Sequence, residues 1–370
     1  MHVVIDRTAL LGALERVKGA LGGSTIPIQS HFLLQAEDAE QLRVTACDGD
    51  KSITATVPAR VERLGALAVC GRLHDVVRRS ADGCQIELRA GEVRIKVHAG
   101  RAKFELVTLP AADFPAMVIK GGRRFAMPAD HLRSIFASVA YAQATDDTRY
   151  YLNGVYLHSW EDSRDGLRRL RGVATDAHRL ARVEVPCPEN AEAMPGIIVA
   201  RNTVGDMARL LEALTGAVTV TVTDTLLGLA GDGVEMVSRL VEGTYPDYER
   251  VIPSGNDKVC EVDAALLAAA VERVTTIGES KTRLLRITFA QAGLTLACSS
   301  PDLGSAVEEV EGDYSGSPID IGFNGKYLTE TLKRITGEGV RLEIGDPAGP
   351  VILRDLGAPE ALYVVMPARV

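Results

Sequence analysis

Residues 173–186 read VATDAHRLARVEVP, and this stretch decides the fold because two other parts of the chain follow the same plan. Residues 45–58 read TACDGDKSITATVP, and residues 296–310 read LACSSPDLGSAVEEV. In each, a short strand-like run leads through a polar connection into a second such run, which is typical of two antiparallel strands. The three copies divide the 370 residues into thirds, and a repeat of this length dictates the architecture.

A predicted helix lies on each side of every copy. The first helix shows the pattern clearly, because Leu10, Leu14 and Val17 recur at helical spacing and Asp6 is placed to cap it. The predicted helices are residues 6–18, 71–80, 128–140, 201–214, 263–275 and 324–336. The predicted fold class is therefore α+β, with three tandem domains that each contain two helices and antiparallel sheets. Their predicted bounds are 1–121, 122–252 and 253–370.

The composition excludes several classes of protein. No run of about 18 apolar residues occurs, and charges interrupt the apolar N-terminal stretch, so we expect a cytoplasmic protein without a membrane span or signal peptide. The six cysteines stand singly, without the Cys-x-x-Cys pairs of zinc sites. The sequence also lacks the Gly-x-x-x-x-Gly-Lys-Ser/Thr phosphate-binding motif. We therefore expect no metal and no cofactor.

The polar connection 175–179 first suggests an active site, because Asp176 could orient His178 as a general base. A hydrolase built on this pair would need a nucleophile or a metal, and the sequence offers no second constellation to supply one. Neither of the other two copies retains the histidine or Arg179. A DNA-binding regulator is a further alternative, but the sequence shows neither a helix-turn-helix pattern nor a basic domain. We therefore predict a non-catalytic protein.

Six stretches resemble the bacterial sliding clamp family, the beta subunits of DNA polymerase III. They are LGGSTIPI (21–28), LPAADFP (109–115), RYYLNG (149–154), VATDAHRLA (173–181), YPDYERVIP (245–253) and YVVMPARV (363–370). The resemblance covers the whole chain. It implies a processivity factor of DNA replication, in which a head-to-tail homodimer of three clamp domains per chain forms a ring around duplex DNA without sequence preference.

The resemblance also implies protein partners. A clamp tethers the replicative polymerase and other proteins that carry short clamp-binding motifs. An ATP-driven clamp loader opens the ring, because the clamp has no phosphate-binding loop of its own. Ring closure would pair an edge strand of the first domain with one of the third domain in the partner chain.

By resemblance, a peptide cleft lies between the second and third domains. The residues carried over to it are Tyr151, Leu152, Thr175, His178, Arg179, Leu180, Pro246, Arg250, Val251, Ala348, Pro350, Val364, Met366 and Pro367. The apolar members suit a pocket for Leu or Phe anchors, and Arg179 and Arg250 are expected to frame its rim. Tyr150 and Tyr151 have the alternative of packing within a sheet. The family commonly has glycine at the position of Ala177, so a positive φ there would strain this chain.

The charges are unevenly distributed along the chain. The net charge is −8, yet the six predicted helices hold 13 Lys or Arg against 9 Asp or Glu, while the remainder holds 28 against 40. The family places two helices of each domain on the inner wall of the ring, which implies a weakly basic bore that holds phosphates loosely. The residues expected to face DNA are Arg16, Lys18, Arg72, Arg78, Arg79, Arg133, Tyr150, Arg201, Arg209, Lys326, Lys333 and Arg334.

Overall fold

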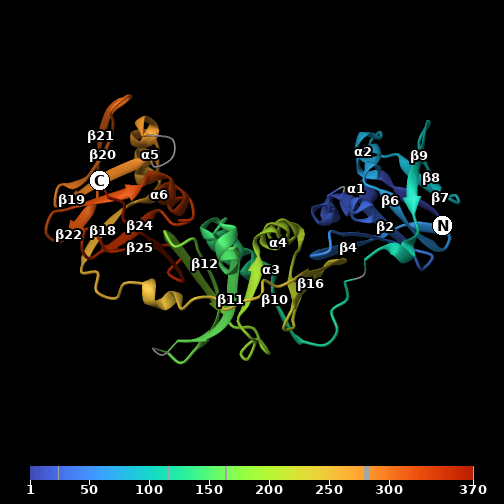
Figure 1. Cartoon of the computed structure of the whole chain (residues 1–370), viewed down its shortest axis with the longest axis horizontal. Helices are drawn as coiled ribbons and strands as arrows, with labels where there is room; N and C mark the ends of the chain where they lie inside the picture. The colour runs from blue at the N-terminus through green and yellow to red at the C-terminus, as the bar shows by residue number, and fades with distance from the viewer. Residues whose placement is uncertain (24, 116, 163–164, 279–282, 370) are drawn as a thin grey trace. The chain divides into compact units, whose positions relative to one another are not determined.

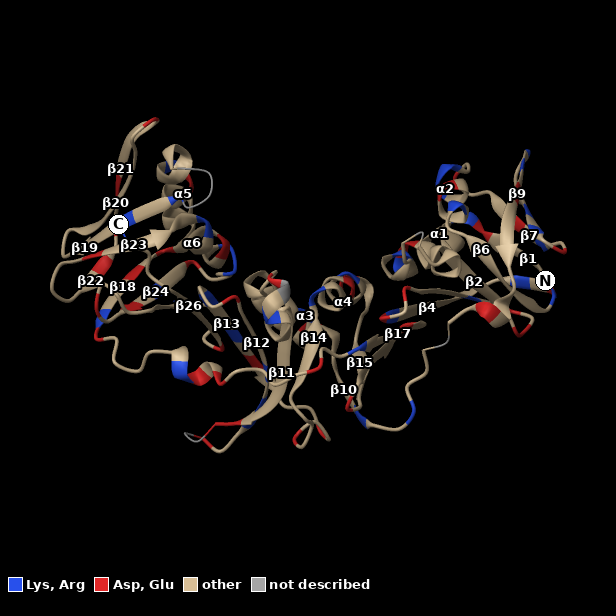
Figure 2. Cartoon of the chain, viewed as in Figure 1, with Lys and Arg blue, Asp and Glu red and all other residues tan. Residues whose placement is uncertain are grey.

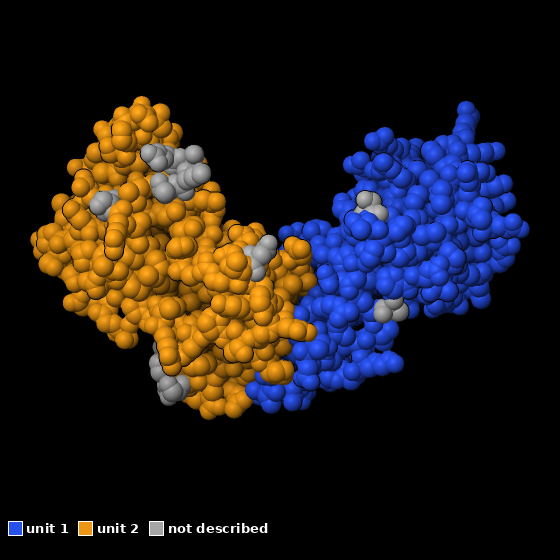
Figure 3. Space-filling model, in the orientation of Figure 1, with its two compact units in different colours: residues 1–130, 189–194, 205–240 blue, residues 131–188, 195–204, 241–370 orange. Residues whose placement is uncertain are grey.

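The structure is a computed structural model of the chain (Figure 1), and it describes all residues except 24, 116, 163–164, 279–282 and 370. The chain divides into two compact units, which Figure 3 shows in different colours. Unit 1 comprises Met1–Asp130, Glu189–Met194 and Gly205–Leu240. Unit 2 comprises His131–Pro188, Pro195–Val204 and Val241–Val370.

Within the described residues, the order βαβββ occurs six times in succession (Figure 1). The first two copies are β1 (His2–Asp6), α1 (Arg7–Val17), β2 (His31–Ala36), β3 (Gln41–Cys47) and β4 (Lys51–Pro58), then β6 (Gly65–Cys70), α2 (Arg72–Arg79), β7 (Gln85–Ala90), β8 (Arg94–Ala99) and β9 (Ala102–Leu109). The next two are β10 (Arg123–Pro128), α3 (Ala129–Val139), β11 (Gly154–Glu161), β12 (Arg168–Thr175) and β13 (Arg179–Pro186), then β14 (Ile197–Ala200), α4 (Arg201–Ala213), β15 (Ala217–Val222), β16 (Leu226–Gly231) and β17 (Val234–Arg239).

The last two copies complete the chain. They are β18 (Lys258–Asp263), α5 (Ala264–Val274), β19 (Leu284–Ala290), β20 (Gly293–Ser300) and β21 (Gly304–Val310), then β23 (Ile319–Asn324), α6 (Gly325–Leu332), β24 (Gly339–Ile344), β25 (Val351–Asp355) and β26 (Ala361–Val365). Two short strands fall outside this order, β5 (Arg60–Arg63) and β22 (Asp313–Ser315). The predicted repeat is therefore confirmed, and each third of the chain is itself a double copy.

The six predicted helices are confirmed, and polar caps explain where several begin. The Asp6 carboxylate accepts from the backbone N–H groups of Thr8 and Ala9, at 2.8 and 3.2 Å. Asp263 caps α5 and Asn324 caps α6 in the same way. The sequence did not predict the strand that immediately precedes each helix, because these short strands merge with the helical pattern that follows.

Helix α6 is shorter than predicted and ends at Leu332. The N–H groups of Arg334 and Ile335 donate three residues back, which tightens the chain into a 3₁₀ turn. The next N–H, that of Thr336, donates to Oδ2 of Asp355 at 2.6 Å and leaves the helix direction. Among the described residues, no helix is long and apolar enough to cross a membrane.

Both units are built on antiparallel sheets. In unit 1, thirteen described strands form one sheet in the order β10-β15-β16-β17-β4-β3-β2-β6-β9-β8-β7-β1-β5. In unit 2, the described strands form a sheet of nine, β14-β11-β12-β13-β26-β25-β24-β18-β22, and a sheet of four, β21-β20-β19-β23. Helix α1 lies beside α2 in unit 1, and α5 lies beside α6 in unit 2.

Each large sheet contains one strand pair that joins successive thirds of the sequence. In unit 1, β4 pairs with β17, with Lys51 opposite Ser238. In unit 2, β13 pairs with β26, with Arg179 opposite Val365. We call these two strand pairs the joints. Lys51 and Arg179 hold equivalent places in the repeat, since each begins the strand after the polar connection.

Candidate functional site

An apolar cleft of about 220 Å³ lies on unit 2. It is formed by the 3₁₀ turn η5 (Asp147–Leu152), the connection between β12 and β13, the 3₁₀ turn η6 (Tyr248–Val251), and β26 with the residues that follow it. Its lining residues are Leu152, Thr175, Ala177, Arg179, Leu180, Pro246, Asp247, Tyr248, Val251, Val364 and Met366. The cleft therefore draws its wall from both partners of the unit 2 joint.

The floor of the cleft is part of a hydrophobic core. Leu152, Leu180 and Val364 are at most 4% exposed and belong to one buried cluster. At the mouth, Val251 is 49% exposed and Met366 is 37% exposed. An apolar side chain that enters the cleft would extend this core, which contributes about 2 kcal/mol for a buried Leu-sized group.

Side-chain hydrogen bonds fix the connection between β12 and β13. Oδ1 of Asp176 accepts from the N–H groups of His178 and Arg179, both at 3.0 Å. The Thr175 hydroxyl donates to the carbonyl of Arg179 at 2.7 Å and accepts from the N–H of Ala177 at 3.1 Å. Asp176 therefore has a structural role in this turn.

Ala177 adopts a φ of 74°, in the left-handed region that favours glycine. Replacing Ala177 with Gly is expected to raise the free energy of unfolding by about 0.5 kcal/mol, because the relief of left-handed strain outweighs the added entropy of the unfolded chain. Urea unfolding followed by the fluorescence of Trp160, the sole tryptophan and a unit 2 residue, measures this change. The same substitution at Ala137, inside α3, should instead lower stability by about 1 kcal/mol. A loss of stability at both positions would contradict the strain at Ala177.

Arg179 lines the cleft, but other residues of unit 2 bind its head group. Its Nε donates to Asp176 at 3.1 Å, its Nη2 donates to the carbonyl of Tyr141 at 2.9 Å, and its Nη1 pairs with Glu330. The guanidinium also lies 4.9 and 4.7 Å from the ring centres of Tyr141 and Tyr327. The side chain is only 8% exposed, so Arg179 braces the wall of the cleft.

Lys51 occupies the equivalent place in unit 1. Its Nζ lies 3.1 Å from Oδ2 of Asp48 and 3.0 Å from Oδ2 of Asp206, and its side chain is 9% exposed. Asp48 belongs to the polar connection and Asp206 to α4, as Asp176 belongs to its connection and Glu330 to α6. At both joints, a cation therefore lies between two carboxylates, one from the polar connection and one from a helix.

Eight of the fourteen residues predicted for the cleft line it, and six do not. His178 stacks on the Tyr327 ring, at 5.8 Å between centres. Arg250 is 84% exposed and pairs with Asp247 at 2.8 Å. The other four that do not line it are Tyr151, Ala348, Pro350 and Pro367.

Three lining residues were missed by the sequence, namely Ala177, Asp247 and Tyr248. Each lies inside a stretch that the sequence had already marked, between two residues that were predicted. The stretches TDAHRL and YPDYERV therefore held the signal. Tyr248 is 6% exposed, and only the folded chain shows that this buried residue lines the cleft.

The residues predicted to face DNA are mostly exposed, and Figure 2 marks a group of basic residues on α2. The exposed ones are Lys18, Arg72, Arg78, Arg79, Tyr150, Arg201, Arg209, Lys326 and Lys333. Arg16, Arg133 and Arg334 are half-buried. Arg334 donates to the carbonyl of Ala137 at 3.3 Å and lies 5.5 Å from the ring centre of Tyr141. Its head group is therefore partly engaged within unit 2.

Several of the exposed basic residues lie close to a carboxylate. Arg72 and Arg78 lie 3.2 and 3.5 Å from Asp75. Lys333 lies 2.8 Å from Glu272. Exposed pairs of this kind are weak and exchange partners readily, so they leave these cations available to phosphates. Among the described side chains, no group of three or more His, Cys, Asp or Glu could hold a metal ion.

Comparison with known proteins agrees with this architecture over the whole chain. The family descriptions for the N-terminal, central and C-terminal domains of the DNA polymerase III beta subunit match residues 1–118, 126–247 and 249–369. The beta sliding clamp of Caulobacter vibrioides is 38% identical, and that of Escherichia coli K12 is 32% identical, each over 100% of both chains.

Solved structures agree as well. The clamp of Bartonella birtlesii bound to griselimycin has a TM-score of 0.96 at 34% identity and covers 100% of both chains. The Caulobacter crescentus clamp with PEG bound to its putative beta-motif tethering region has a TM-score of 0.96 at 38% identity, and covers 100% of this chain and 99% of that one. The chain therefore belongs to the family of bacterial beta sliding clamps, the non-catalytic subunits that act as processivity factors of DNA polymerase III.

Proposed function

We propose that two copies of the chain join head to tail into a closed ring that encircles duplex DNA and slides along it without sequence preference. The full-length family match is the observation that carries this proposal. The domain bounds that we propose are 1–121, 122–252 and 253–370, and the location is cytoplasmic. Retention on circular but not on linear DNA is the test of encirclement.

The joints support the head-to-tail arrangement. Each joint pairs the strand after a polar connection with the last strand of the next third of the chain. Among the described residues, one strand of each kind has an edge without a partner strand. Strand β21 pairs only with β20, and residues 102–107 of β9 pair only with β8. Pairing β21 of one copy with β9 of the other would form the missing joint twice and close the ring.

The side chains of these two edges suit such a pairing. Phe104 and Val107 on β9 are 37% and 54% exposed, and Val307 on β21 is 67% exposed. Exposed apolar side chains on a sheet edge are typical of an interface. The charges are complementary, since β8 and β9 carry Arg94, Lys96 and Lys103 against Glu105 alone, while β21 carries Glu308 and Glu309 and no basic residue.

The basic helices support weak binding to DNA. A closed ring resists escape by topology, so it needs only loose phosphate contacts, and strong base-edge contacts would stop it from sliding. Small surpluses of Arg on helices such as α1 and α2 fit this requirement better than a strongly basic surface would. The twelve residues that the sequence analysis expects to face DNA remain our proposal for this surface.

We propose the cleft as the docking site for short apolar motifs of the replicative polymerase, the clamp loader and other partners. Its buried apolar floor and exposed Met366 and Val251 at the mouth suit a Leu or Phe anchor, and a few such anchors dominate binding of this kind. Arg250 is 84% exposed and its surface ion pair with Asp247 is weak, so we assign its head group to the rim of the cleft. Opening of the ring is assigned to an ATP-driven clamp loader.

Replacing Met366 with Ala is expected to weaken binding of the peptide Gln-Leu-Ala-Leu-Phe about tenfold, because it removes apolar contact at the mouth of the cleft. Isothermal titration calorimetry measures the affinity. The control is Met117→Ala, which truncates a half-buried methionine of unit 1 and should leave the affinity unchanged. Equal affinities for the parent and the Met366 variant would remove Met366 from the site.

A further inference from the structure

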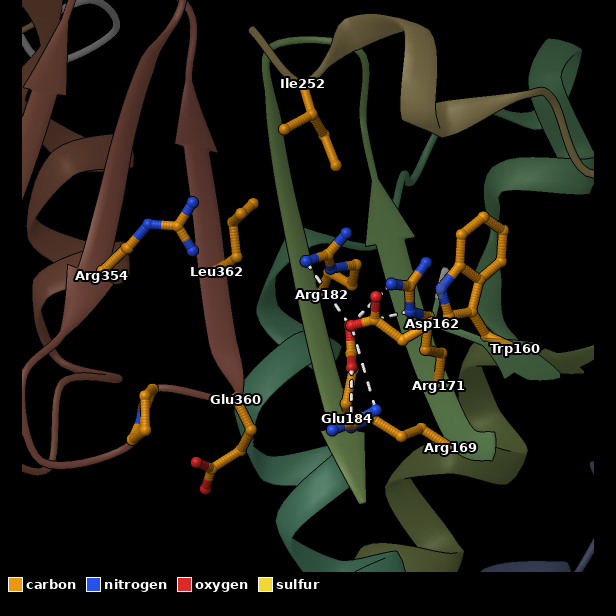
Figure 4. A pocket seen from close by; sticks show the side chains of 11 residues that line it. Trp160, Asp162, Arg169, Arg171, Arg182, Glu184, Ile252, Arg354, Glu360 and Leu362 are labelled. Carbon is orange, nitrogen blue, oxygen red and sulfur yellow. Dashed lines mark hydrogen bonds and ion pairs between the residues drawn. The ribbon is translucent and has the colours of Figure 1, made fainter. Parts of the chain in front are cut away.

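A charged pocket of about 540 Å³ lies beside the cleft on unit 2 (Figure 4). Arg171 on β12 and Arg182 on β13 line this pocket, while Thr175 and Leu180 on the same strands line the cleft. The spacing between the two residues on each strand is even, so the charged pocket and the cleft share one face of the sheet. The sequence predicts no function for this charged region.

Tyr248 lies where the two hollows meet. Its ring lines the cleft, and its hydroxyl is hydrogen bonded to two residues, His158 and Arg171, of which Arg171 also lines the charged pocket. In the described part of the chain, no backbone hydrogen bond ties residues 242–251 to a strand. The position of Tyr248 therefore depends on its side-chain contacts rather than on a sheet.

His158 on β11 holds the hydroxyl of Tyr248 from one side. Its Nδ1 lies 3.0 Å from the carbonyl of Ser159, which can only accept, so Nδ1 carries the proton. Its Nε2 lies 2.9 Å from Tyr248 Oη and accepts from it. Burial raises the pKa of Tyr248 to about 12, and burial together with the nearby Arg171 charge holds the pKa of His158 below its ordinary value. Both groups thus keep the protonation states that this hydrogen bond requires.

Arg171 holds the same hydroxyl from the other side. Its Nη1 lies 3.3 Å from Tyr248 Oη and 2.6 Å from Glu249, and its Nε and Nη2 each lie 2.8 Å from Oε1 of Glu184. Its guanidinium lies 4.0 Å from the centre of the Trp160 ring. Arg171 is 3% exposed, and Figure 4 shows it converging with its neighbours on Glu184. These contacts hold the Arg171 side chain in one position, and so fix the Nη1 group that donates to the Tyr248 hydroxyl.

We propose that His158 and Arg171 are positioning residues for the peptide cleft, because their hydrogen bonds to the Tyr248 hydroxyl fix that ring as a wall of the site. The inference rests on the proposed function of the cleft. It assigns the charged pocket, with Trp160 and Glu184, the role of holding Arg171 in place. Neither His158 nor Arg171 would touch the peptide.

The test is a double-substitution cycle on peptide affinity. His158→Phe keeps a flat ring but cannot accept the hydroxyl proton, and Tyr248→Phe removes only the hydroxyl oxygen. His158→Phe is expected to weaken binding of the peptide Gln-Leu-Ala-Leu-Phe by about threefold to tenfold, as expected for one lost buried hydrogen bond. Tyr248→Phe should weaken it at least as much, because it also removes the hydrogen bond from Arg171. The double variant should bind no more weakly than the Tyr248 variant alone, because Tyr248→Phe already removes the hydroxyl that His158 holds.

The control is Thr45→Val, which removes a buried hydrogen bond of 2.9 Å to Thr54 in unit 1. It should lower the melting temperature and leave peptide affinity unchanged. Trp160 supplies a second readout, since its fluorescence should change when the parent binds peptide and should change less in the Tyr248 variant. This readout remains available even if the His158 variant fails to fold.

Two results would overturn the positioning role. One is a His158→Phe variant that binds as tightly as the parent. The other is a double variant whose loss equals the product of the two single losses, since the residues would then act independently. A parent chain that binds no peptide at all would overturn the proposed function of the cleft, and the inference with it.

Discussion

Replacing Arg179 with Met is expected to lower the free energy of unfolding of unit 2 by about 2–4 kcal/mol, because it removes the buried cation that lies between two carboxylates. Asp176 and Glu330 both face Arg179, and the side chain of Asp176 is only 16% exposed. Glu330 is 34% exposed, so solvent screens part of its charge and places the loss at the lower end of the range for broken buried pairs. The stacking of Arg179 on two tyrosine rings is lost as well.

The fluorescence of Trp160 during urea unfolding reports this transition, because the sole tryptophan lies in unit 2. Arg250→Met is the matched control, since Arg250 is 84% exposed and its ion pair contributes about 0–1 kcal/mol. A loss at Arg179 no larger than at Arg250 would contradict the bracing role. Peptide affinity should fall together with stability in the Arg179 variant, because the cleft wall loses its support.

Replacing Val307 with Glu is expected to convert the dimer into a monomer. The substitution would bury a charge in the proposed β9–β21 contact, beside Glu308 and Glu309. A head-to-tail ring contains this contact twice, so a cost of about 2 kcal/mol at each would raise the dissociation constant roughly a thousandfold. The chain has a mass of 39.5 kDa, and sedimentation equilibrium should find twice that mass for the parent and the single mass for the variant.

Leu167→Glu is the control for the loss of the dimer. Leu167 is 59% exposed and lies in unit 2, between β11 and β12. It is not on β9 or β21, so its substitution should leave the dimer intact. A Val307 variant that keeps the dimer mass would place the subunit interface elsewhere.

The sequence predicted the repeat, the helices and the α+β class because these depend on local patterns. Apolar spacing and the cap at Asp6 mark a helix within a few residues. The strands that precede the helices were missed, although they complete the βαβββ order. Short strands next to a helix carry too few residues for a period to be visible.

The candidate site was predicted less completely, because its geometry depends on residues far apart in the sequence. The ion pair between Arg179 and Glu330 spans 151 residues, and no local pattern can reveal it. Comparison of the three copies in the sequence shows that Arg179 is not repeated. The structure shows that Lys51 has the same role in unit 1, so this position serves the joint in both copies.

Retention on DNA of defined topology tests most directly whether the protein encircles the duplex. The protein is loaded with a clamp loader and ATP onto a nicked circular plasmid, the salt concentration is raised, and bound and free protein are separated by gel filtration. High salt weakens phosphate contacts steeply, but a closed ring cannot leave circular DNA, because the circle has no free end. We predict that the protein stays on the salt-washed circle and leaves once a single cut linearises it. Equal retention on the circular and the linear form, or release from the intact circle by salt, would contradict encirclement.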